Sequence, residues 1–242
     1  MDLGIAGKVA LVTASSKGLG RAAAEALAAD GAKVVICARG DAALKEAEAA
    51  IAAAGGEVTA IVADVTEPDQ PARLVAATVE RYGGLDILVP NAGGPPPGRA
   101  LEVSDEAVKA AVDANLLTSV RLVREAVPYM RGRGWGRICM IVSAAVKQPI
   151  PTLALSNTAR TGLWAWAKTA AADLFADGIT LNLACPGFHA TDRTRELGAR
   201  GDVRMGDAAD FGRIVAFLCS RHAAFVSGVA LQVDGAATAG LL

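Results

Sequence analysis

The stretch KVALVTASSKGLGRAAAEAL, residues 8–27, decides the fold. It begins with a short apolar run at Lys8–Thr13, passes through a turn that contains Gly18 and Gly20, and ends in an alanine-rich segment typical of a helix. A buried strand, a glycine-containing turn and a helix in this order direct backbone N–H groups and a helix N-terminus at one point, which suits a phosphate group. The stretch therefore predicts a nucleotide-binding β–turn–α unit.

The same alternation of short apolar runs and longer amphipathic ones continues along the chain. Continuous apolar strands between helices predict a parallel sheet that is covered on both faces. We expect a single α/β domain over residues 1–242, a doubly wound (Rossmann) fold whose parallel sheet has about seven strands, with helices on both faces. The expected strands are Lys8–Thr13, Lys33–Ala38, Val58–Ala63, Ile87–Pro90, Arg137–Val142, Thr180–Ala184 and Val229–Val233, and the expected helices are Leu19–Asp30, Ala42–Ala54, Pro68–Tyr82, Asp105–Arg131, Leu155–Ala176 and Asp207–Ser220.

Composition excludes several classes of protein. Hydrophobic residues make up 52% of the 242 residues and the formal net charge is −1, so the chain has no basic field for nucleic acid or an anionic membrane surface. The N-terminus does not resemble a signal peptide, and no apolar stretch is long enough to predict a membrane span. We expect a cytoplasmic protein without a metal site, because its cysteines lie singly in apolar runs, as buried free thiols do: Cys37, Cys139, Cys185 and Cys219.

The end of the second expected strand bears on the cofactor. A Rossmann site for NAD places an acid there to hold the ribose 2′-hydroxyl, whereas this strand is followed by Arg39. Arginine matches phosphate oxygens well, and Lys17 in the glycine turn is placed to help, so the sequence favours NADP(H). The alternative is that both cations are solvated loop charges, and Asp41 nearby weakens the distinction between the two interpretations.

Several ordered motifs resemble those of the short-chain dehydrogenase/reductase family over nearly the whole chain. Residues 13–20 resemble TGxxxGxG with Ala14 in place of the first glycine, residues 90–93 resemble NNAG without its first asparagine, and Pro186, Gly187 and Thr191 resemble PGxxxT. The resemblance implies that Asp64 and Val65 contact the adenine. Together with the cations above, the implied cofactor-binding set is Thr13, Ser15, Ser16, Lys17, Gly18, Leu19, Gly20, Arg39, Asp64, Val65, Asn91, Ala92, Gly93, Pro186, Gly187 and Thr191.

The family's catalytic positions are filled in an unusual way. Ser143 stands at the place of the catalytic serine and Asn115 resembles the catalytic helix asparagine. In the family a tyrosine follows the serine by thirteen residues and a lysine follows that tyrosine by four; here those positions are Ser156 and Arg160. The resemblance therefore implies a catalytic set of Ser143, Ser156, Arg160 and Asn115, in which SxxxR replaces the YxxxK dyad.

This replacement limits the proton chemistry. The pKa of a serine hydroxyl is far above that of tyrosine, and arginine remains charged, so neither relays a proton as the dyad does. Ser143 and Ser156 can still hydrogen-bond a carbonyl oxygen, and Arg160 can hold a ribose or stabilise an oxyanion. The proton then comes from water through Asn115, or from His189, although a loop histidine commonly has no such role.

The leading hypothesis is an NADP(H)-dependent oxidoreductase that reduces a ketone or a 3-oxoacyl-type carbonyl with a proton donor other than tyrosine. One alternative is a nucleotide-binding, catalytically impaired homologue that acts as a sensor or oligomeric partner. Another is a lyase or dehydratase on the same fold. The substrate itself cannot be read from the sequence, although the loop Gly93–Gly98 is expected to line the crevice that holds it.

Two further expectations concern the lid and the assembly. Residues 192–205 are expected to form a short polar lid over the substrate, or merely a surface loop of different length. By resemblance, the expected helices 105–131 and 155–176 pair across a two-fold axis, and we expect a homo-oligomer, a tetramer. Trp164 and Trp166 face different sides of their helix, so that one fills the core and the other is left for a partner subunit, unless both are buried within one subunit.

Overall fold

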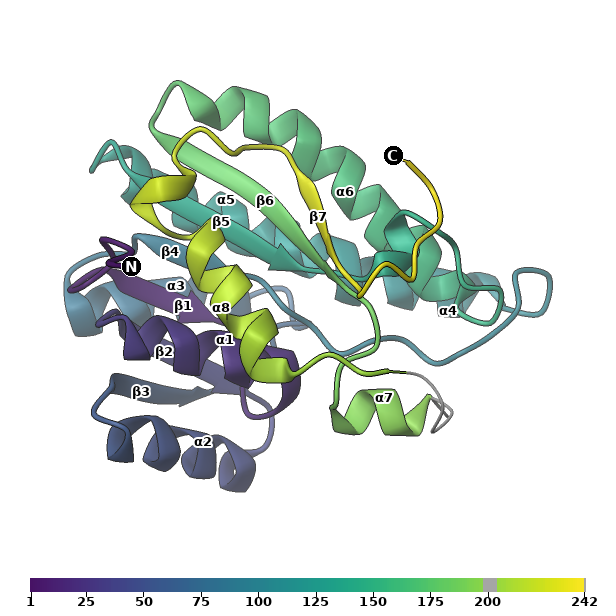
Figure 1. Ribbon diagram of the computed structural model, residues 1–242, viewed down its shortest axis with the longest axis horizontal. Coiled ribbons are helices and arrows are strands. Elements are labelled where there is room, and N and C mark those ends of the chain that lie inside the picture. The colour runs from purple at the N-terminus through teal and green to yellow at the C-terminus, as the bar shows by residue number, and fades with distance from the viewer. Residues whose placement is uncertain (198–203, 242) are drawn as a thin grey trace.

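The computed structural model describes residues 1–197 and 204–241 of the chain. Its centre is a seven-stranded, all-parallel sheet with the strand order β3-β2-β1-β4-β5-β6-β7 (Figure 1). The fold expected from the sequence is therefore confirmed. The strands are β1 Val9–Val12, β2 Lys33–Ala38, β3 Glu57–Val62, β4 Ile87–Val89, β5 Gly136–Ile141, β6 Ile179–Pro186 and β7 Ala230–Val233.

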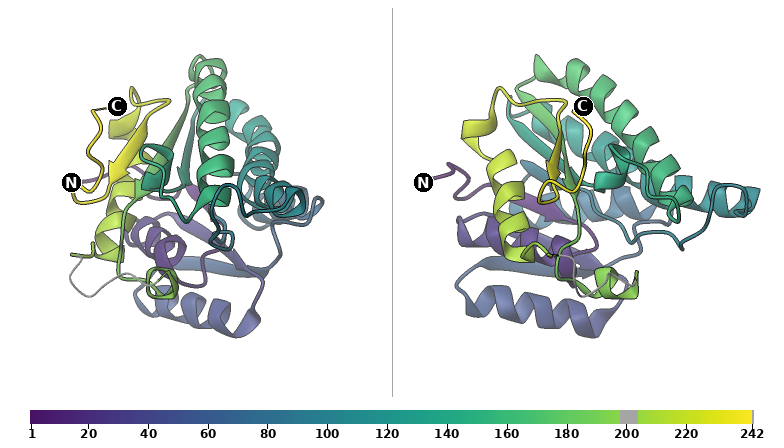
Figure 2. Two further views of the ribbon diagram at one scale, coloured as in Figure 1. Left: turned by 90° about the vertical axis from the view of Figure 1, so that its right-hand side faces the viewer. Right: turned by 45° about the vertical axis from the view of Figure 1, so that its right-hand side comes forward.

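Helices cover both faces of this sheet (Figure 2). One face is covered by α1 (Gly18–Ala29), α2 (Asp41–Ala53) and α8 (Ala208–Leu218), of which α1 and α8 pack together. The other face is covered by α3 (Gln70–Tyr82), α5 (Thr118–Arg131) and α6 (Ala154–Phe175). The shorter elements are α4 (Asp105–Val112), the π-helical turn η1 (Asp113–Leu117), η2 (Ala144–Val146), α7 (Asp192–Glu196) and η3 (Arg221–Ala223).

The core follows from the two-residue period of the strands. Leu11 and Val35 point to the α3, α5 and α6 side, whereas their neighbours Val12 and Ile36 point to the α1, α2 and α8 side. All four side chains are fully buried, because both faces of a parallel sheet are covered by helices. This explains why the strands appear in the sequence as continuous apolar runs.

The expected strand ends differ from the observed ones by no more than two residues, but one expected helix is wrong in detail. The segment Asp105–Arg131 is not one α-helix, because α4 and α5 are separated by the π-helical turn η1. An extra residue in the turn widens the helix at this point, and the Thr118 hydroxyl donates to the Asp113 carbonyl at 3.1 Å. Hydrophobic periodicity does not reveal such a turn, since apolar residues continue through it.

Strand order reverses between β1 and β4, and this reversal positions the site. The chain winds outward from β1 to β3 on one side and from β4 to β7 on the other. The connections leave the sheet in opposite directions at this point, so a crevice opens beyond the carboxyl ends of the strands. Among the described helices, none is long and apolar enough to cross a lipid bilayer.

Candidate active site

The turn between β1 and α1 brings the backbone close to itself. Ala14 adopts a left-handed conformation with φ of 46°, and Gly18 has φ of 61°. A Cβ at Gly20 would lie 2.5 Å from the Ala14 carbonyl oxygen and 2.7 Å from Nδ2 of Asn91, so only glycine fits there. The turn is thus a tight cradle at the start of α1, where helix N–H groups point outward.

Two predicted cofactor residues hold this cradle together with their own side chains. The Thr13 hydroxyl donates to the Asn91 carbonyl at 2.7 Å and accepts from the Asn91 N–H at 2.8 Å, which joins the ends of β1 and β4. The buried Ser15 hydroxyl donates to the Val12 carbonyl at 2.7 Å and accepts from the Cys37 N–H at 3.0 Å. The hydroxyls of Thr13 and Ser15 therefore shape the turn and are not directed outward.

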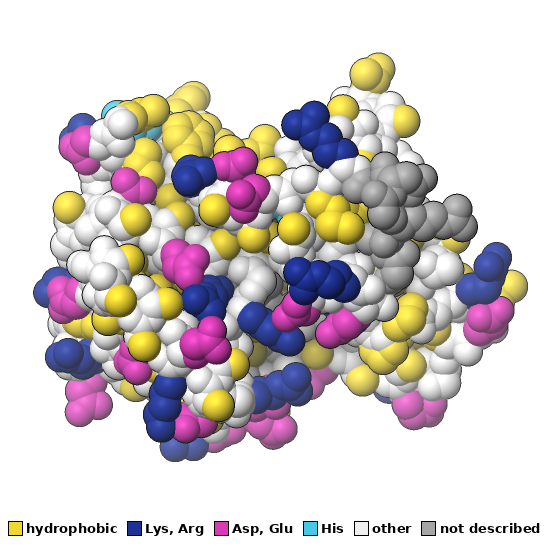
Figure 3. All heavy atoms as spheres, turned by 60° about the horizontal axis from the view of Figure 1, so that its bottom comes forward, with side chains coloured by type: hydrophobic (Ala, Val, Ile, Leu, Met, Phe, Trp, Pro, Cys, Tyr) yellow, Lys and Arg dark blue, Asp and Glu magenta, His cyan; other side chains and the backbone are white. Residues whose placement is uncertain are grey.

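The start of α1 suits the diphosphate of a dinucleotide. Lys17 precedes the helix, and among the described residues no side chain caps the first N–H groups of α1, which suits the binding of an anion. The glycines that remove side chains from the turn allow the close approach that such a ligand needs. Figure 3 shows Lys and Arg side chains, with acidic ones among them, around a hollow in this face of the molecule.

The two cations predicted to select the cofactor are exposed at the rim. The Arg39 side chain, at the end of β2, is 79% exposed, and its guanidinium lies 4.0 Å from the Asp64 carboxylate. That carboxylate also accepts from the Thr66 N–H at 3.0 Å and from its hydroxyl at 2.7 Å. The Lys17 ammonium lies 3.9 Å from Asp192 of α7. Both cations are free to turn towards a phosphate.

Helix α7 lies over the glycine turn. Thr191 caps it, with its hydroxyl oxygen accepting from the Thr194 N–H at 3.3 Å. A Cβ at Gly18 would lie 3.8 Å from the Thr191 methyl carbon, so the end of the PGxxxT segment meets the turn after β1. The remaining predicted cofactor residues lie at the edge formed by the carboxyl ends of the strands: Ser16 and Leu19 in and after the turn, Val65 after β3, Ala92 and Gly93 after β4, and Pro186 and Gly187 at the end of β6.

Ser143 and Arg160 both lie at the end of β5. Ser143 is the first residue of the turn into η2, and its hydroxyl oxygen accepts from the Ala145 N–H at 3.1 Å, which leaves its hydrogen free to donate. Nη1 of Arg160 donates to the carbonyls of Val142 at 3.1 Å and Ile141 at 3.3 Å. Its Nη2 donates to the Ala92 carbonyl at 3.4 Å. One side chain on α6 thus joins the ends of β4 and β5.

Arg160 is a buried cation whose contacts with the protein are to neutral groups. Its side chain is only 8% exposed, and Ser156 on the same face of α6 is equally buried. Burial, and then the charge of Arg193, lower the pKa of Arg160 to about 10. Arg160 therefore stays protonated at neutral pH, so it is able to stabilise a negative charge but not to exchange a proton.

Asn115 lies in the π-helical turn η1, which packs against α6. A Cβ at Gly162 of α6 would lie 2.9 Å from Leu116, so the two helices touch at this point. Asn115 is 3% exposed, and its Oδ1 has no hydrogen-bond partner in the described chain. A buried acceptor without a partner is costly, and such groups are commonly satisfied by a water or a ligand.

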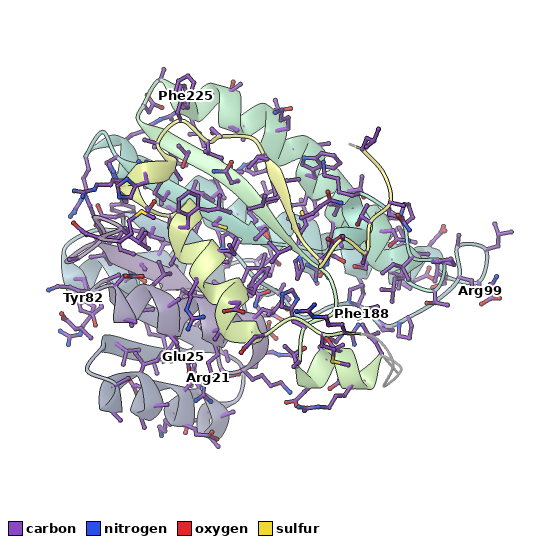
Figure 4. The ribbon with its side chains drawn as sticks, in the orientation of Figure 1. Arg21, Glu25, Tyr82, Arg99, Phe188 and Phe225 are labelled. Atoms are coloured by element: carbon purple, nitrogen blue, oxygen red, sulfur yellow. The ribbon has the colours of Figure 1, made fainter. Side chains whose placement is uncertain are left out.

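His189, the other proton donor considered from the sequence, is held by contacts with its neighbours. Its ring packs edge-on against Phe211 of α8, with the centroids 5.2 Å apart, and its Nδ1 lies 3.2 Å from the Gly187 carbonyl. The side chain is 4% exposed. The histidine is therefore buried within the segment between β6 and α7, and its role as a proton donor stays a prediction. The neighbouring Phe188 is half exposed where the chain leaves β6 (Figure 4).

Two contributors to the site were not foreseen. The amide of Asn157 donates to the Ile150 carbonyl at 2.9 Å and braces the loop between η2 and α6. Arg193 of α7 donates to the Pro95 carbonyl at 2.8 Å, across the loop that follows β4. The charged segment after Thr191 was the only sequence signal for Arg193, and charge alone does not distinguish a site arginine from a solvated one. Of the expected lid, residues 198–203 lie outside the described residues.

A family model described as short chain dehydrogenase matches residues 8–201 of the chain. The chain belongs to the short chain dehydrogenase family. It is 35% identical over 243 residues to dehydrogenase/reductase SDR family member 4 of Homo sapiens, covering 96% of this chain and 87% of that protein. It is 36% identical over 237 residues to a 3-oxoacyl-(acyl-carrier-protein) reductase of a Synechocystis strain, covering 94% and 96%.

Solved structures give the same result. L-sorbose reductase from Gluconobacter frateurii, in a complex with NADPH and L-sorbose, is 32% identical, with a TM-score of 0.90 over 97% of this chain and 98% of that one. The family membership expected from the motifs is therefore confirmed, and the protein is a short-chain oxidoreductase of the kind that binds a nicotinamide cofactor.

Proposed function

We propose that this protein is an NADP(H)-dependent reductase of a ketone or 3-oxoacyl-type carbonyl, and that Ser156 and Arg160 stand in the positions of the family's tyrosine and lysine. The observation that carries the proposal is the contact of Arg160 with the carbonyl of Val142, directly before Ser143. It puts a fixed cation and a free hydroxyl hydrogen at one corner of the crevice, beside the loop after β4. The names of the reductases similar to this chain agree with the reaction class.

The residues for the cofactor are those around the glycine turn. The N–H groups at the start of α1 would hold the diphosphate, Arg39 and Lys17 the 2′-phosphate, and Asp64 and Val65 the adenine. Residues 91–93 and the segment Pro186–Thr191 would flank the nicotinamide. When bound, NADPH supplies a hydride to the carbonyl carbon.

The chain's own residues then act on the carbonyl oxygen. The Ser143 hydroxyl donates a hydrogen bond to that oxygen, and Ser156 offers a second one from α6. The fixed charge of Arg160 stabilises the negative charge that develops there. Because both serines have a pKa far too high to give up their protons, the proton that completes the alcohol comes from water, which the orphaned Oδ1 of Asn115 is suited to hold. The reaction is therefore slow compared with one that uses a tyrosine.

Steady-state oxidation of NADPH at 340 nm tests this proposal, with a panel of ketones and 3-oxoacyl thioesters as substrates. We expect weak but saturable turnover that Ser143→Ala abolishes. Lack of turnover with every member of the panel, together with tight NADPH binding, would instead support a second function. That function is a nucleotide-binding sensor or oligomeric partner without catalysis, and the observation that favours it is the serine in place of tyrosine at position 156.

We also propose that the protein is a cytoplasmic homo-oligomer, a tetramer. The two tryptophans of α6 line different grooves of the surface. Trp166 lies in a groove between α5 and α6, and Trp164, under the Lys147 ammonium at 4.1 Å, lies in another beside β7. Both tryptophans are half-buried and both contact the core, so each leaves part of its side chain exposed for a partner subunit.

A further inference from the structure

Two arginines approach the loop after β4 from different elements. Arg160 reaches it from α6 and donates to the Ala92 carbonyl at 3.4 Å, and Arg193 reaches it from α7 and donates to the Pro95 carbonyl at 2.8 Å. A Cβ at Gly94, between these two contacts, would lie 3.0 Å from Nη2 of Arg193. The two guanidinium groups therefore flank a stretch of only a few residues at the crevice. Arg99 is not part of this arrangement, because it lies exposed at the outer end of the loop (Figure 4).

The positive charge at this point is only partly balanced. Within the described chain, no carboxylate lies within 4.0 Å of Arg160. Besides burial, the charge that affects the pKa of Arg160 is the like charge of Arg193, which lowers it. Among the described residues Arg193, whose side chain is 40% exposed, has one acidic neighbour, Glu196, whose carboxylate is 3.6 Å away and 59% exposed. Like charges near a buried site cost free energy unless an anion offsets them. A neutral ketone would not supply that anion.

The guanidinium of Arg160 also keeps hydrogen-bonding capacity. Of its five N–H donors, three are engaged by the carbonyls of Ile141, Val142 and Ala92. The remaining donors match the paired oxygens of a carboxylate. The phosphates of the cofactor do not fit this role, because the turn and the helix start that suit them lie at the end of β1.

We propose that the substrate is a short oxo acid whose carboxylate is held between Arg160 and Arg193. This proposal rests on the proposed reductase function and adds the substrate class. Because Arg160 contacts the carbonyl of Val142 and Ser143 follows directly, the carboxylate and the reacting carbonyl lie within a few bonds of each other. A 2-oxo or 3-oxo acid satisfies that spacing, whereas a long neutral acyl chain does not use the two charges.

Binding of matched pairs to the protein with saturating NADPH tests this assignment without requiring turnover. Isothermal titration calorimetry compares acetoacetate with methyl acetoacetate, and pyruvate with methyl pyruvate, which differ in the charge of the carboxyl group and by one methyl group. We expect at least one acid to bind about tenfold or more tightly than its ester, as expected for hydrogen bonds to a charged group. Equal affinity for acid and ester within both pairs would overturn the proposal.

Variants on α7 show whether Arg193 is responsible for the preference for the acid over its ester. Arg193→Gln is expected to weaken binding of the acid by about tenfold and to leave the ester unchanged. Arg195→Gln is the matched control, because this residue lies on the same short helix but is 70% exposed and pairs with Asp192. Equal loss of acid and ester in Arg193→Gln, or equal loss of acid in both variants, would also contradict the assignment.

The NADPH titration that precedes each experiment separates the two proposals. Failure to bind NADPH refutes the proposed function, and the oxo-acid proposal falls with it. If NADPH binds and neutral ketones are reduced, but neither acid is preferred over its ester, then only the substrate class is wrong. Arg160→Lys provides a second variant at the buried position: it keeps the charge but loses paired donors, so the preference for the acid should narrow rather than vanish.

Discussion

Nη1 of Arg160 lies 3.1 Å from the carbonyl oxygen of Val142, the residue that precedes Ser143. The same guanidinium also donates to the Ala92 carbonyl in the loop after β4, so Arg160 links the end of β5 to that loop. The arginine therefore contributes to the site in two ways. It holds the ends of β4 and β5 together, and its guanidinium stays protonated at neutral pH.

The first prediction concerns the pair Ser156 and Arg160. Changing both, Ser156→Tyr with Arg160→Lys, should raise the NADPH-dependent reduction of ketones, by up to about 10²–10⁴-fold if general acid catalysis is fully restored. Either change alone should do less. The free energy of unfolding of the double variant should fall by about 1–3 kcal/mol, because carbonyls lose their donor. Initial rates and urea unfolding measure both effects. A fast native enzyme that the double change inactivates would refute this account.

The second prediction concerns the cofactor. NADPH should bind about tenfold or more tightly than NADH, because Arg39 and Lys17 meet the 2′-phosphate with charge-assisted hydrogen bonds. Arg39→Asp should narrow or reverse this preference in calorimetric titrations. Arg73→Asp is a suitable control, since this arginine is also exposed, at 72%, but lies on α3. Equal affinity of the unmodified protein for both cofactors would exclude the proposed role of Arg39.

Most of the fold could be predicted from the sequence, because it depends on periodicity and on glycine positions. The apolar run before Thr13 and the turn at Gly18 and Gly20 indicated the first β–turn–α unit, and all expected strands are present. The break at Asn115 could not be predicted, since a π turn leaves the apolar pattern intact. The π turn arises from one extra residue between two helical segments.

The sequence named candidate residues for the site but not the contacts that those residues make. The motif spacing named Arg160, but not the main-chain carbonyls that hold it. Those acceptors are peptide groups, which every residue carries and no motif records. Likewise, Arg193 became visible only when α7 was placed over the loop at Pro95. Contacts made by main-chain atoms depend on the packing of elements, and this requires the tertiary structure.

The third prediction concerns assembly. Light scattering at micromolar concentration should give the mass of a homo-oligomer, expected to be a tetramer. Ala170→Glu should reduce that mass, because it places a charge in the groove between α5 and α6, beside Trp166. Ala53→Glu, on the exposed side of α2, should leave the mass unchanged. A monomeric mass for the unmodified protein would contradict the prediction.

The fourth prediction concerns pH. Burial raises the pKa of the Cys37 and Cys185 thiols to about 12, above the value in the unfolded chain. Between about pH 9 and 12 the unfolded chain therefore loses thiol protons that the native protein keeps, so the free energy of unfolding falls as pH rises, by about 1.4 kcal/mol per pH unit for each thiol. Below pH 8 this contribution is constant. When urea unfolding is measured between pH 8 and 10.5, the free energy of unfolding of Cys37→Ala should fall less steeply with pH than that of the unmodified protein. Parallel pH dependences for the two proteins would contradict this prediction.

The fifth prediction concerns the backbone of the glycine turn. Ala14 has φ of 46°, a left-handed conformation that costs an L-residue about 1–2 kcal/mol, and its carbonyl accepts from Nδ2 of Asn91 at 3.1 Å. Ala14→Gly removes that strain but adds entropy to the unfolded chain, so the free energy of unfolding should rise by about 0.5–1 kcal/mol. For a chain of this length, each 1 kcal/mol raises Tm by about 2–4 °C, which calorimetry can detect.

A matched control for Ala14→Gly exists at the other end of the chain. Ala236 has φ of 65° and is exposed, away from the turn between β1 and α1. Ala236→Gly should therefore stabilise the protein to a similar extent and leave the affinity for NADPH unchanged. Ala42→Gly, in the right-handed helix α2, should destabilise it by about 0.5–1 kcal/mol. If Ala14→Gly lowers Tm as Ala42→Gly does, then the left-handed conformation at position 14 is not a source of strain, and an alanine there is as well suited to the turn as a glycine.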